Sequence, residues 1–122
     1  METAIKESIV LEEGIPYDIE LDIMTEDDLG AETPAPIYGF KFLLQARENI
    51  KKKTPFIELS TENGGISITD PANGKVLIKF SSEVSRTRKT SGIYDLVGFD
   101  SDGSPFKIMY GPISIKQTVS DW

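Results

Sequence analysis

The chain has 122 residues, the length of one domain, and its 20 acidic and 13 basic side chains give a net charge of −7. It contains neither cysteine nor histidine, which excludes disulfide bonds, thiolate or imidazole metal sites and a catalytic triad built on histidine. The acidity argues against nucleic-acid binding, because neutralising phosphates requires a clustered basic surface. We expect a single domain over residues 1–122 without a cofactor or a metal ion.

Targeting signals are not apparent in the sequence. The N-terminal residues contain neither the basic start nor the long apolar run of a signal peptide. No stretch approaches the roughly 18 consecutive apolar residues of a membrane-spanning helix. These features predict a chain that is made and kept in a cytoplasm and that does not associate with a membrane.

The acidic residues are concentrated near the N-terminus. Residues 1–32 carry 11 acidic side chains and one basic side chain, whereas residues 33–122 carry 9 acidic and 12 basic ones. Such an asymmetry can orient neighbouring copies head to tail or steer a basic partner toward the chain. Alternatively, the acids form the solvated face of edge strands, where charge discourages unwanted pairing.

Two strands are predicted first, over residues 5–11 and 17–23, with a turn at 14–16 between them. In the second strand apolar and acidic residues alternate strictly, which is typical of a half-buried antiparallel strand. One face then belongs to the core and the other is acidic. The acidic face is a candidate contact for a partner, through Asp18, Glu20 and Asp22.

Residues 26–36 show no hydrophobic periodicity and contain Gly30, Pro34 and Pro36, which predicts a long surface connection. Such a connection, like the N-terminal segment, can act as a flexible arm that grips a neighbour. Its acidic residues are further candidate contacts: Glu26, Asp27 and Asp28.

A long strand follows over residues 37–48, and Leu43 interrupts its alternation. Leu43 therefore indicates either a bulge or an outer face that is partly covered. The next turn carries three consecutive lysines, Lys51, Lys52 and Lys53. Lysines at a loop tip are usually only solvated, but they can also bind phosphate or an acidic partner.

The second half of the chain repeats short apolar stretches separated by glycine turns. Strands are predicted over 56–59, 66–68, 75–80, 93–100, 106–110 and 113–119, and Asp102-Gly103 is the strongest hairpin signal. The polar segment between the third and fourth of these predicts one short helix or helical turn near 82–90. Gly111-Pro112 predicts a bulge.

Strands at intervals of roughly 8 to 12 residues, with a turn signal between each pair, predict an all-β fold. We expect a single antiparallel β-sandwich of immunoglobulin-like type. The last residue, Trp122, is a candidate contact, either as an anchor folded onto the core or as a contact with a neighbouring chain.

The sequence offers little support for catalysis or ion binding. Residues 100–103 resemble the start of a calcium loop, but the glutamate that closes such a loop does not follow. Residues 63–65 are followed by no Gly-Lys-Ser/Thr, so a phosphate-binding loop is not indicated. The N-terminal carboxylates alternate on an exposed strand face, where nothing would desolvate them for acid–base catalysis.

The order of the turns in the second half is distinctive. It runs Asn63-Gly64-Gly65-Ile66-Ser67-Ile68, Asp70-Pro71-Ala72-Asn73-Gly74-Lys75-Val76, a polar segment, Ser91-Gly92-Ile93-Tyr94-Asp95-Leu96, Asp102-Gly103 and Gly111-Pro112-Ile113-Ser114-Ile115. This order resembles a small β-sandwich module of tailed bacteriophages and prophages, similar to the N-terminal modules of upper-baseplate and fibre-anchoring proteins. The resemblance covers about the last half of the chain and, more weakly, residues 37–47.

The resemblance implies a non-enzymatic structural protein of the virion, synthesised in the host cytoplasm, whose partners are other capsid or tail proteins. Those modules usually precede a longer fibre region, whereas this chain ends at Trp122. We therefore expect an accessory subunit for capsid decoration or for the tail, neck or baseplate, with self-association into a homo-oligomer as an option. The alternative is a carbohydrate-binding β-sandwich, which needs a planar aromatic platform. The chain's main aromatic residues fall mostly at core-type positions of the alternation: Tyr17, Tyr38, Tyr94, Phe99 and Tyr110.

Overall fold

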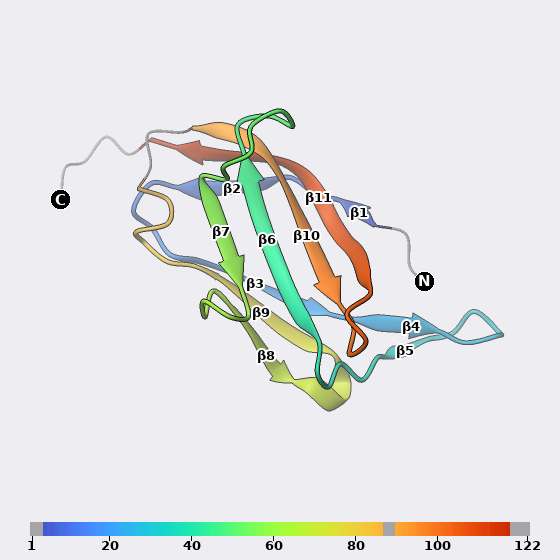
Figure 1. Cartoon of the computed structure of the whole chain (residues 1–122). Helices are drawn as coiled ribbons and strands as arrows, with labels where there is room; N and C mark the ends of the chain where they lie inside the picture. Colours follow the sequence, from blue (N-terminus) through green and yellow to red (C-terminus); the bar gives the residue numbers. More distant parts are fainter. Residues whose placement is uncertain (1–3, 87–89, 118–122) are drawn as a thin grey trace.

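The computed structural model describes residues 4–86 and 90–117, which form two facing β-sheets and a projecting hairpin (Figure 1). The six-stranded sheet contains β1 (Ile5–Lys6), β2 (Ile9–Glu12), β6 (Lys41–Arg47), β7 (Ile57–Ser60), β10 (Ser91–Phe99) and β11 (Pro105–Lys116). The three-stranded sheet contains β3 (Tyr17–Asp22), β8 (Ile66–Asp70) and β9 (Lys75–Phe80). The hairpin consists of β4 (Met24–Glu26) and β5 (Glu32–Pro34).

The strand order confirms the predicted all-β sandwich. The larger sheet runs β11-β10-β6-β7 and the smaller one β3-β9-β8, all antiparallel. These orders correspond to the G-F-C-C′ and B-E-D orders of immunoglobulin domains. The sandwich is not purely antiparallel, because β1 and β2 both pair in parallel with β11 at the sheet edge.

The core lies between the two sheets and follows from the alternation of side chains along each strand. From the larger sheet, Phe42, Leu44 and Leu96 point inward and are buried. From β9, Ile78 and Phe80 meet them within one apolar cluster. Burying each such side chain contributes about 1.5–3 kcal/mol of transfer free energy.

The predicted surface connection at 26–36 is exposed over residues 26–34, but it contains strands that were not predicted. Met24, Thr25 and Glu26 pair with Pro34, Thr33 and Glu32 to form the β4–β5 hairpin. The strands have only three residues each, are largely exposed and include a proline. They therefore lack the alternation of buried and exposed residues by which strands are recognised in a sequence.

The expected helix near 82–90 is not formed in the described part of that segment. Residues 81–86 instead make two hydrogen-bonded turns, from Val84 N to Ser81 O and from Arg86 N to Glu83 O. The buried Ser85 hydroxyl accepts a hydrogen bond from Gly14 N at 2.8 Å, and this tertiary contact holds the turn. Within the described chain, the helical residues are the 3₁₀ turn Pro71–Asn73, and no helix there has the length and apolar character of a membrane span.

The bulge predicted at Gly111-Pro112 is also wrong. Gly111 and Pro112 pair with β10 without a break in register. The register shifts elsewhere: Leu96 pairs with Met109 and Val97 pairs with Lys107, so Ile108 is the extra residue. The proline is tolerated because it lies between two paired stretches of β11: β1 pairs as far as Tyr110, and β2 begins opposite Ile113.

Candidate functional site

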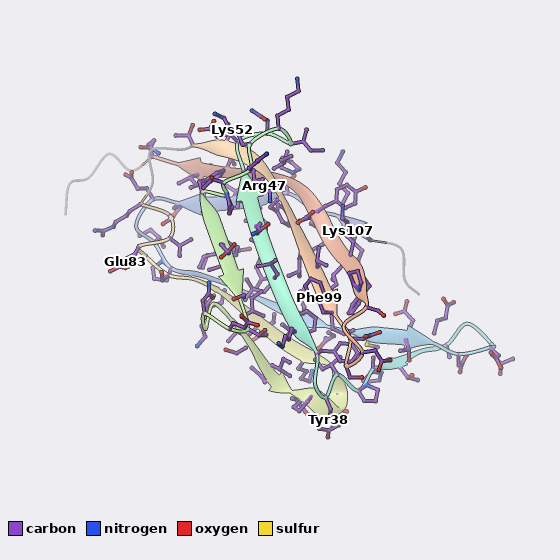
Figure 2. The ribbon with its side chains drawn as sticks, viewed as in Figure 1. Tyr38, Arg47, Lys52, Glu83, Phe99 and Lys107 are labelled. Carbon is purple, nitrogen blue, oxygen red and sulfur yellow. The ribbon has the colours of Figure 1, made fainter. Side chains whose placement is uncertain are left out.

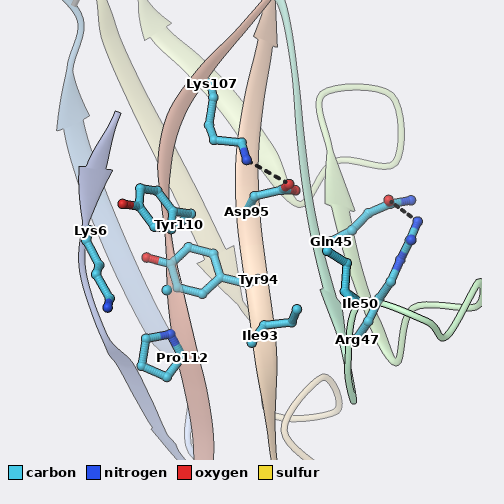
Figure 3. Close-up of a pocket in the computed structure, with 11 residues that line it drawn as sticks. Lys6, Gln45, Arg47, Ile50, Ile93, Tyr94, Asp95, Lys107, Tyr110 and Pro112 are labelled. Atoms are coloured by element: carbon cyan, nitrogen blue, oxygen red, sulfur yellow. Dashed lines mark hydrogen bonds and ion pairs between the residues drawn. The ribbon is translucent and has the colours of Figure 1, made fainter. Parts of the chain in front are cut away.

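A hollow of about 610 Å³ lies on the outer face of the six-stranded sheet (Figure 3). It is lined by residues of β1, β6, β10 and β11 and of the turn that follows β6. Because side chains alternate along a strand, the residues that face this hollow are the neighbours of core residues. We call this feature the outer hollow.

The outer hollow has an apolar component. Ile50 is 82% exposed, Ile93 is 43% exposed and Tyr110 is 38% exposed, and Pro112 also lines the hollow. Ile93 and Pro112 are cross-strand partners in the β10–β11 ladder, so their side chains lie on the same face of the sheet. Leu43, whose irregular position indicated a bulge or a covered outer face, is half-buried on this side with its register intact.

The described residues that line the outer hollow include three cations, Lys6, Arg47 and Lys107, and one carboxylate, Asp95. Lys107 Nζ lies 3.8 Å from Asp95 Oδ2, and both side chains are about half exposed. Such exposed pairs stabilise a fold by at most about 1 kcal/mol. Arg47 Nη2 donates to Gln45 Oε1 at 3.1 Å, which holds the guanidinium beside the Gln45 amide (Figure 3). The hollow therefore combines an apolar surface with excess positive charge.

The three candidate lysines lie next to the outer hollow. Asn49 organises their turn, since its side-chain Oδ1 and its carbonyl O accept hydrogen bonds from Lys51 N and Lys52 N. The turn places Ile50 in the hollow and exposes all three lysines. Figure 2 shows Lys52 at the same end of the sheet as Arg47. The lysine tip thus extends the positive border of the hollow.

A buried tyrosine of the core, Tyr94, also lines the hollow. Tyr94 donates its hydroxyl hydrogen to Glu7 O at 2.7 Å. A side chain at Gly111 would place its Cβ 2.3 Å from the same carbonyl. Burial, together with the negative charge of Glu7, raises the pKa of Tyr94 to about 12. The hydroxyl group is a neutral hydrogen-bond donor at pH 7, and the raised pKa keeps it neutral to higher pH than an ordinary tyrosine. Its hydrogen bond to Glu7 O positions the N-terminal segment at the sheet edge.

The acidic face predicted for residues 17–23 is present on β3. Asp18, Glu20 and Asp22 are exposed there, opposite Lys79, Leu77 and Lys75 of β9. Lys75 Nζ lies 3.1 Å from Asp22 Oδ1. Lysines of the neighbouring strand therefore partly offset the charge of this face, which is less negative than the sequence of β3 alone suggests.

The remaining acidic candidates belong to the β4–β5 hairpin. Asp27 Oδ1 accepts hydrogen bonds from Leu29 N and Ala31 N, each at 2.9 Å, and Gly30 has a φ of 83°. This geometry is an Asx-type turn, in which an aspartate side chain replaces a backbone acceptor. Asp28 and Leu29 are consequently at the tip, where Leu29 is 94% exposed.

The base of the hairpin is attached to the smaller sheet. Ile23 N donates to Gly74 O at 2.8 Å, and Ala35 N donates to Ile23 O at 2.9 Å. Ala35 and Ile37 on the following segment are buried. The hairpin therefore projects from a fixed base, away from the sandwich (Figure 1).

The candidate contacts thus occupy three places: the β3 face, the hairpin and the lysine tip. Trp122 lies outside the described residues. The outer hollow was not predicted, because it combines residues from distant parts of the sequence. One feature of the sequence could have indicated it. Ile93 and Tyr110 are large apolar residues at outward-facing positions of strands whose inward-facing positions are already filled by core residues.

The described residues contain no group of three or more aspartate, glutamate, histidine or cysteine side chains placed to hold a metal ion. No protein-family model matches the chain, and no curated protein matches its sequence.

Proposed function

We propose that the chain is a non-enzymatic structural subunit that docks onto other proteins of a bacteriophage particle. The observation that carries the docking role is the outer hollow. Its apolar side chains, among them Ile50, Ile93 and Tyr110, remain exposed beside several cations. Exposed apolar groups with a polar border are typical of protein interaction sites. Other virion proteins, from the capsid or the tail, are the proposed partners.

The phage assignment rests on the resemblance in the order of turns. Each turn is built from local interactions: Asn63 Oδ1 accepts from Ser60 N and Gly65 N, and Asp100 Oδ1 accepts from Asp102 N and Ser104 N. Such turns occur in many sandwiches. The support therefore comes from their shared order, and the location proposed for the mature protein is the virion.

A carbohydrate-binding module is the alternative, and it requires aromatic side chains that form a planar platform. The expectation that the tyrosines occupy core-type positions is wrong for Tyr17, Tyr38 and Tyr110, which are exposed, whereas Tyr94 is buried. The exposed ones lie on β3, on the connection after β5 and on β11, and do not form one platform. Lys107 Nζ also lies 5.6 Å from the Tyr110 ring centre, over the ring. This arrangement favours protein docking over sugar stacking.

The proposal can be tested on particles released by the organism that encodes the chain. An antibody raised against the purified protein should label intact particles in immunogold electron microscopy, at a consistent place on the head or the tail. Particles that lack the gene product should show neither label nor the corresponding density. Unlabelled particles, with all of the protein in the particle-free fraction, would refute the virion role. A saturable hit on a glycan array would instead favour the carbohydrate alternative.

A further inference from the structure

The β4–β5 hairpin has the composition of a ligand for a basic, partly apolar surface. Residues 24–34 contain four carboxylates and no lysine or arginine. Leu29 projects at the tip and is 94% exposed. The Asx turn made by Asp27 and the cross-strand contact between Thr25 Oγ1 and Thr33 Oγ1, at 3.3 Å, give the hairpin a defined shape. A preformed hairpin loses little conformational entropy when it binds.

The outer hollow has the complementary composition. Its apolar surface can receive a leucine side chain. Three cations border that surface, Lys6, Arg47 and Lys107, against one carboxylate, Asp95, which lies 3.8 Å from Lys107 Nζ. The lysine tip adds three exposed cations beside Ile50. Opposite charges around an apolar contact fix the orientation of two partners and accelerate their encounter.

The hairpin cannot fill the hollow of its own chain. Its base is tied to Gly74 by the hydrogen bond from Ile23 N, and the hairpin points away from the sandwich (Figure 1). The hollow lies on the outer face of the other sheet. Both complementary surfaces are therefore present on each copy, and both are exposed.

We infer that the β4–β5 hairpin of one copy binds in the outer hollow of a second copy. Leu29 packs against Ile50, Ile93 and Tyr110, and the hairpin carboxylates lie near the cations of the hollow and of the lysine tip. A second copy is the occupant that the charges favour, because every copy that carries the basic hollow also carries the acidic hairpin. This inference goes beyond the proposed function and does not depend on it.

The contact joins two different surfaces, so it is heterologous. A copy that binds through its hairpin offers its own hollow either to the hairpin of the same neighbour, which closes a reciprocal dimer, or to the hairpin of a further copy. Heterologous contacts close into rings when the rotation between copies allows it, and otherwise continue as filaments. A dimer in which hairpin meets hairpin, or hollow meets hollow, is not what this arrangement predicts.

The test is sedimentation velocity of the full chain over a range of concentrations. The wild-type protein should associate as concentration rises, into a dimer where two hairpins are exchanged reciprocally and into larger species where they are not. Leu29→Ser on the hairpin and Ile50→Ser on the hollow should each weaken the apparent association at least tenfold. Both side chains are more than four-fifths exposed, so neither change should disturb folding. Tyr38→Ser is the matched control, since Tyr38 is 62% exposed and lies on neither surface.

Mixing the two variants gives the decisive result. The Leu29→Ser chain keeps an intact hollow, and the Ile50→Ser chain keeps an intact hairpin. Each should be largely monomeric alone, while an equimolar mixture should form a one-to-one dimer and nothing larger. A wild-type protein that stays monomeric at all concentrations would overturn the inference, as would variants that associate like wild type or a mixture that does not dimerise. Immunogold labelling of particles is unaffected by these outcomes, so the two proposals can fail separately.

Discussion

At the scale of single residues, two glycines show how closely segments of this fold approach one another. Gly74 has a φ of 68°, and a Cβ there would lie 2.4 Å from Ile23 O and 2.7 Å from Ala35 O. These carbonyls belong to the segments that enter and leave the β4–β5 hairpin. Gly103 also has a positive φ, 86°, but a Cβ there would meet nothing within 4 Å. Comparing alanine substitutions at the two positions therefore separates the cost of backbone strain from the cost of steric conflict.

Gly74→Ala should lower the free energy of unfolding by about 3 kcal/mol, because the strained φ and the contact with two carbonyls both oppose the side chain. Gly103→Ala should cost about 1 kcal/mol, from the backbone conformation alone. Urea denaturation followed by circular dichroism measures both values. Equal losses at the two positions would show that the close approach at Gly74 contributes nothing.

Tyr94 has a role that depends on its hydroxyl group. Tyr94→Phe removes the hydrogen bond to Glu7 O and should lower the free energy of unfolding by about 1 kcal/mol at pH 7. Because the folded pKa is about 12 and the usual value is 10.0, the unfolded state loses this proton first as pH rises. Its contribution to stability is thus complete below pH 10 and declines up to pH 12.

Paired urea titrations of wild type and Tyr94→Phe at neutral and alkaline pH test this dependence. Lysine ionisation affects both proteins, so the difference between them isolates the tyrosine. The advantage of the wild type should shrink above pH 10. A difference that stays constant up to pH 12 would contradict the burial of the hydroxyl.

At the scale of elements, strands with clear alternation were predicted well. Over Tyr17–Asp22, Ile19 and Leu21 are partly buried against the core and the acids face outward, whereas Tyr17, at the start of the strand, is 47% exposed. The turn at Asp102-Gly103 does join β10 to β11, with Gly103 N donating to Asp100 O at 2.9 Å. Both features depend on neighbouring residues alone, which is why the sequence was sufficient for them.

Elements that depend on distant contacts were not predicted. The β4–β5 hairpin is held at its base by Gly74, about fifty residues away in the chain. The bulge at Ile108 depends on the register between two long strands. The outer hollow likewise requires Lys6 and Lys107 to be brought together by the parallel pairing of β1 with β11. Local patterns carry no information about such pairings.

The hairpin turn offers a test at this scale. Asp27→Ala removes the acceptor of two amide hydrogen bonds, from Leu29 N and Ala31 N. Opening of the turn should become easier by about 1 kcal/mol per lost bond, so exchange of these amides should accelerate on the order of tenfold. Asp28→Ala is the matched control, because it removes the same charge from the adjacent, exposed position. Hydrogen exchange followed by NMR distinguishes the two, and equal acceleration would mean that charge, not the turn geometry, controls the tip.

At the scale of the whole molecule, the net charge and the local charges have opposite effects on self-association. With a net charge of −7, two copies repel each other on average, and added salt would weaken that repulsion. The hairpin and the outer hollow carry opposite charges, and salt would weaken their attraction instead. The direction of the salt effect therefore reports which term governs self-association.

We expect self-association of the wild-type chain to weaken as NaCl is raised from about 0.01 M to about 1 M, over which the screening length falls from about 30 Å to about 3 Å. Replacing Lys51, Lys52 and Lys53 together by glutamine should weaken association at low salt and reduce its salt dependence, because these exposed lysines extend the positive border of the hollow. Sedimentation velocity at matched protein concentrations measures both effects. If association instead strengthens with salt, average repulsion between acidic copies dominates, and any contact between copies is held by apolar surface without help from the charge of the hairpin.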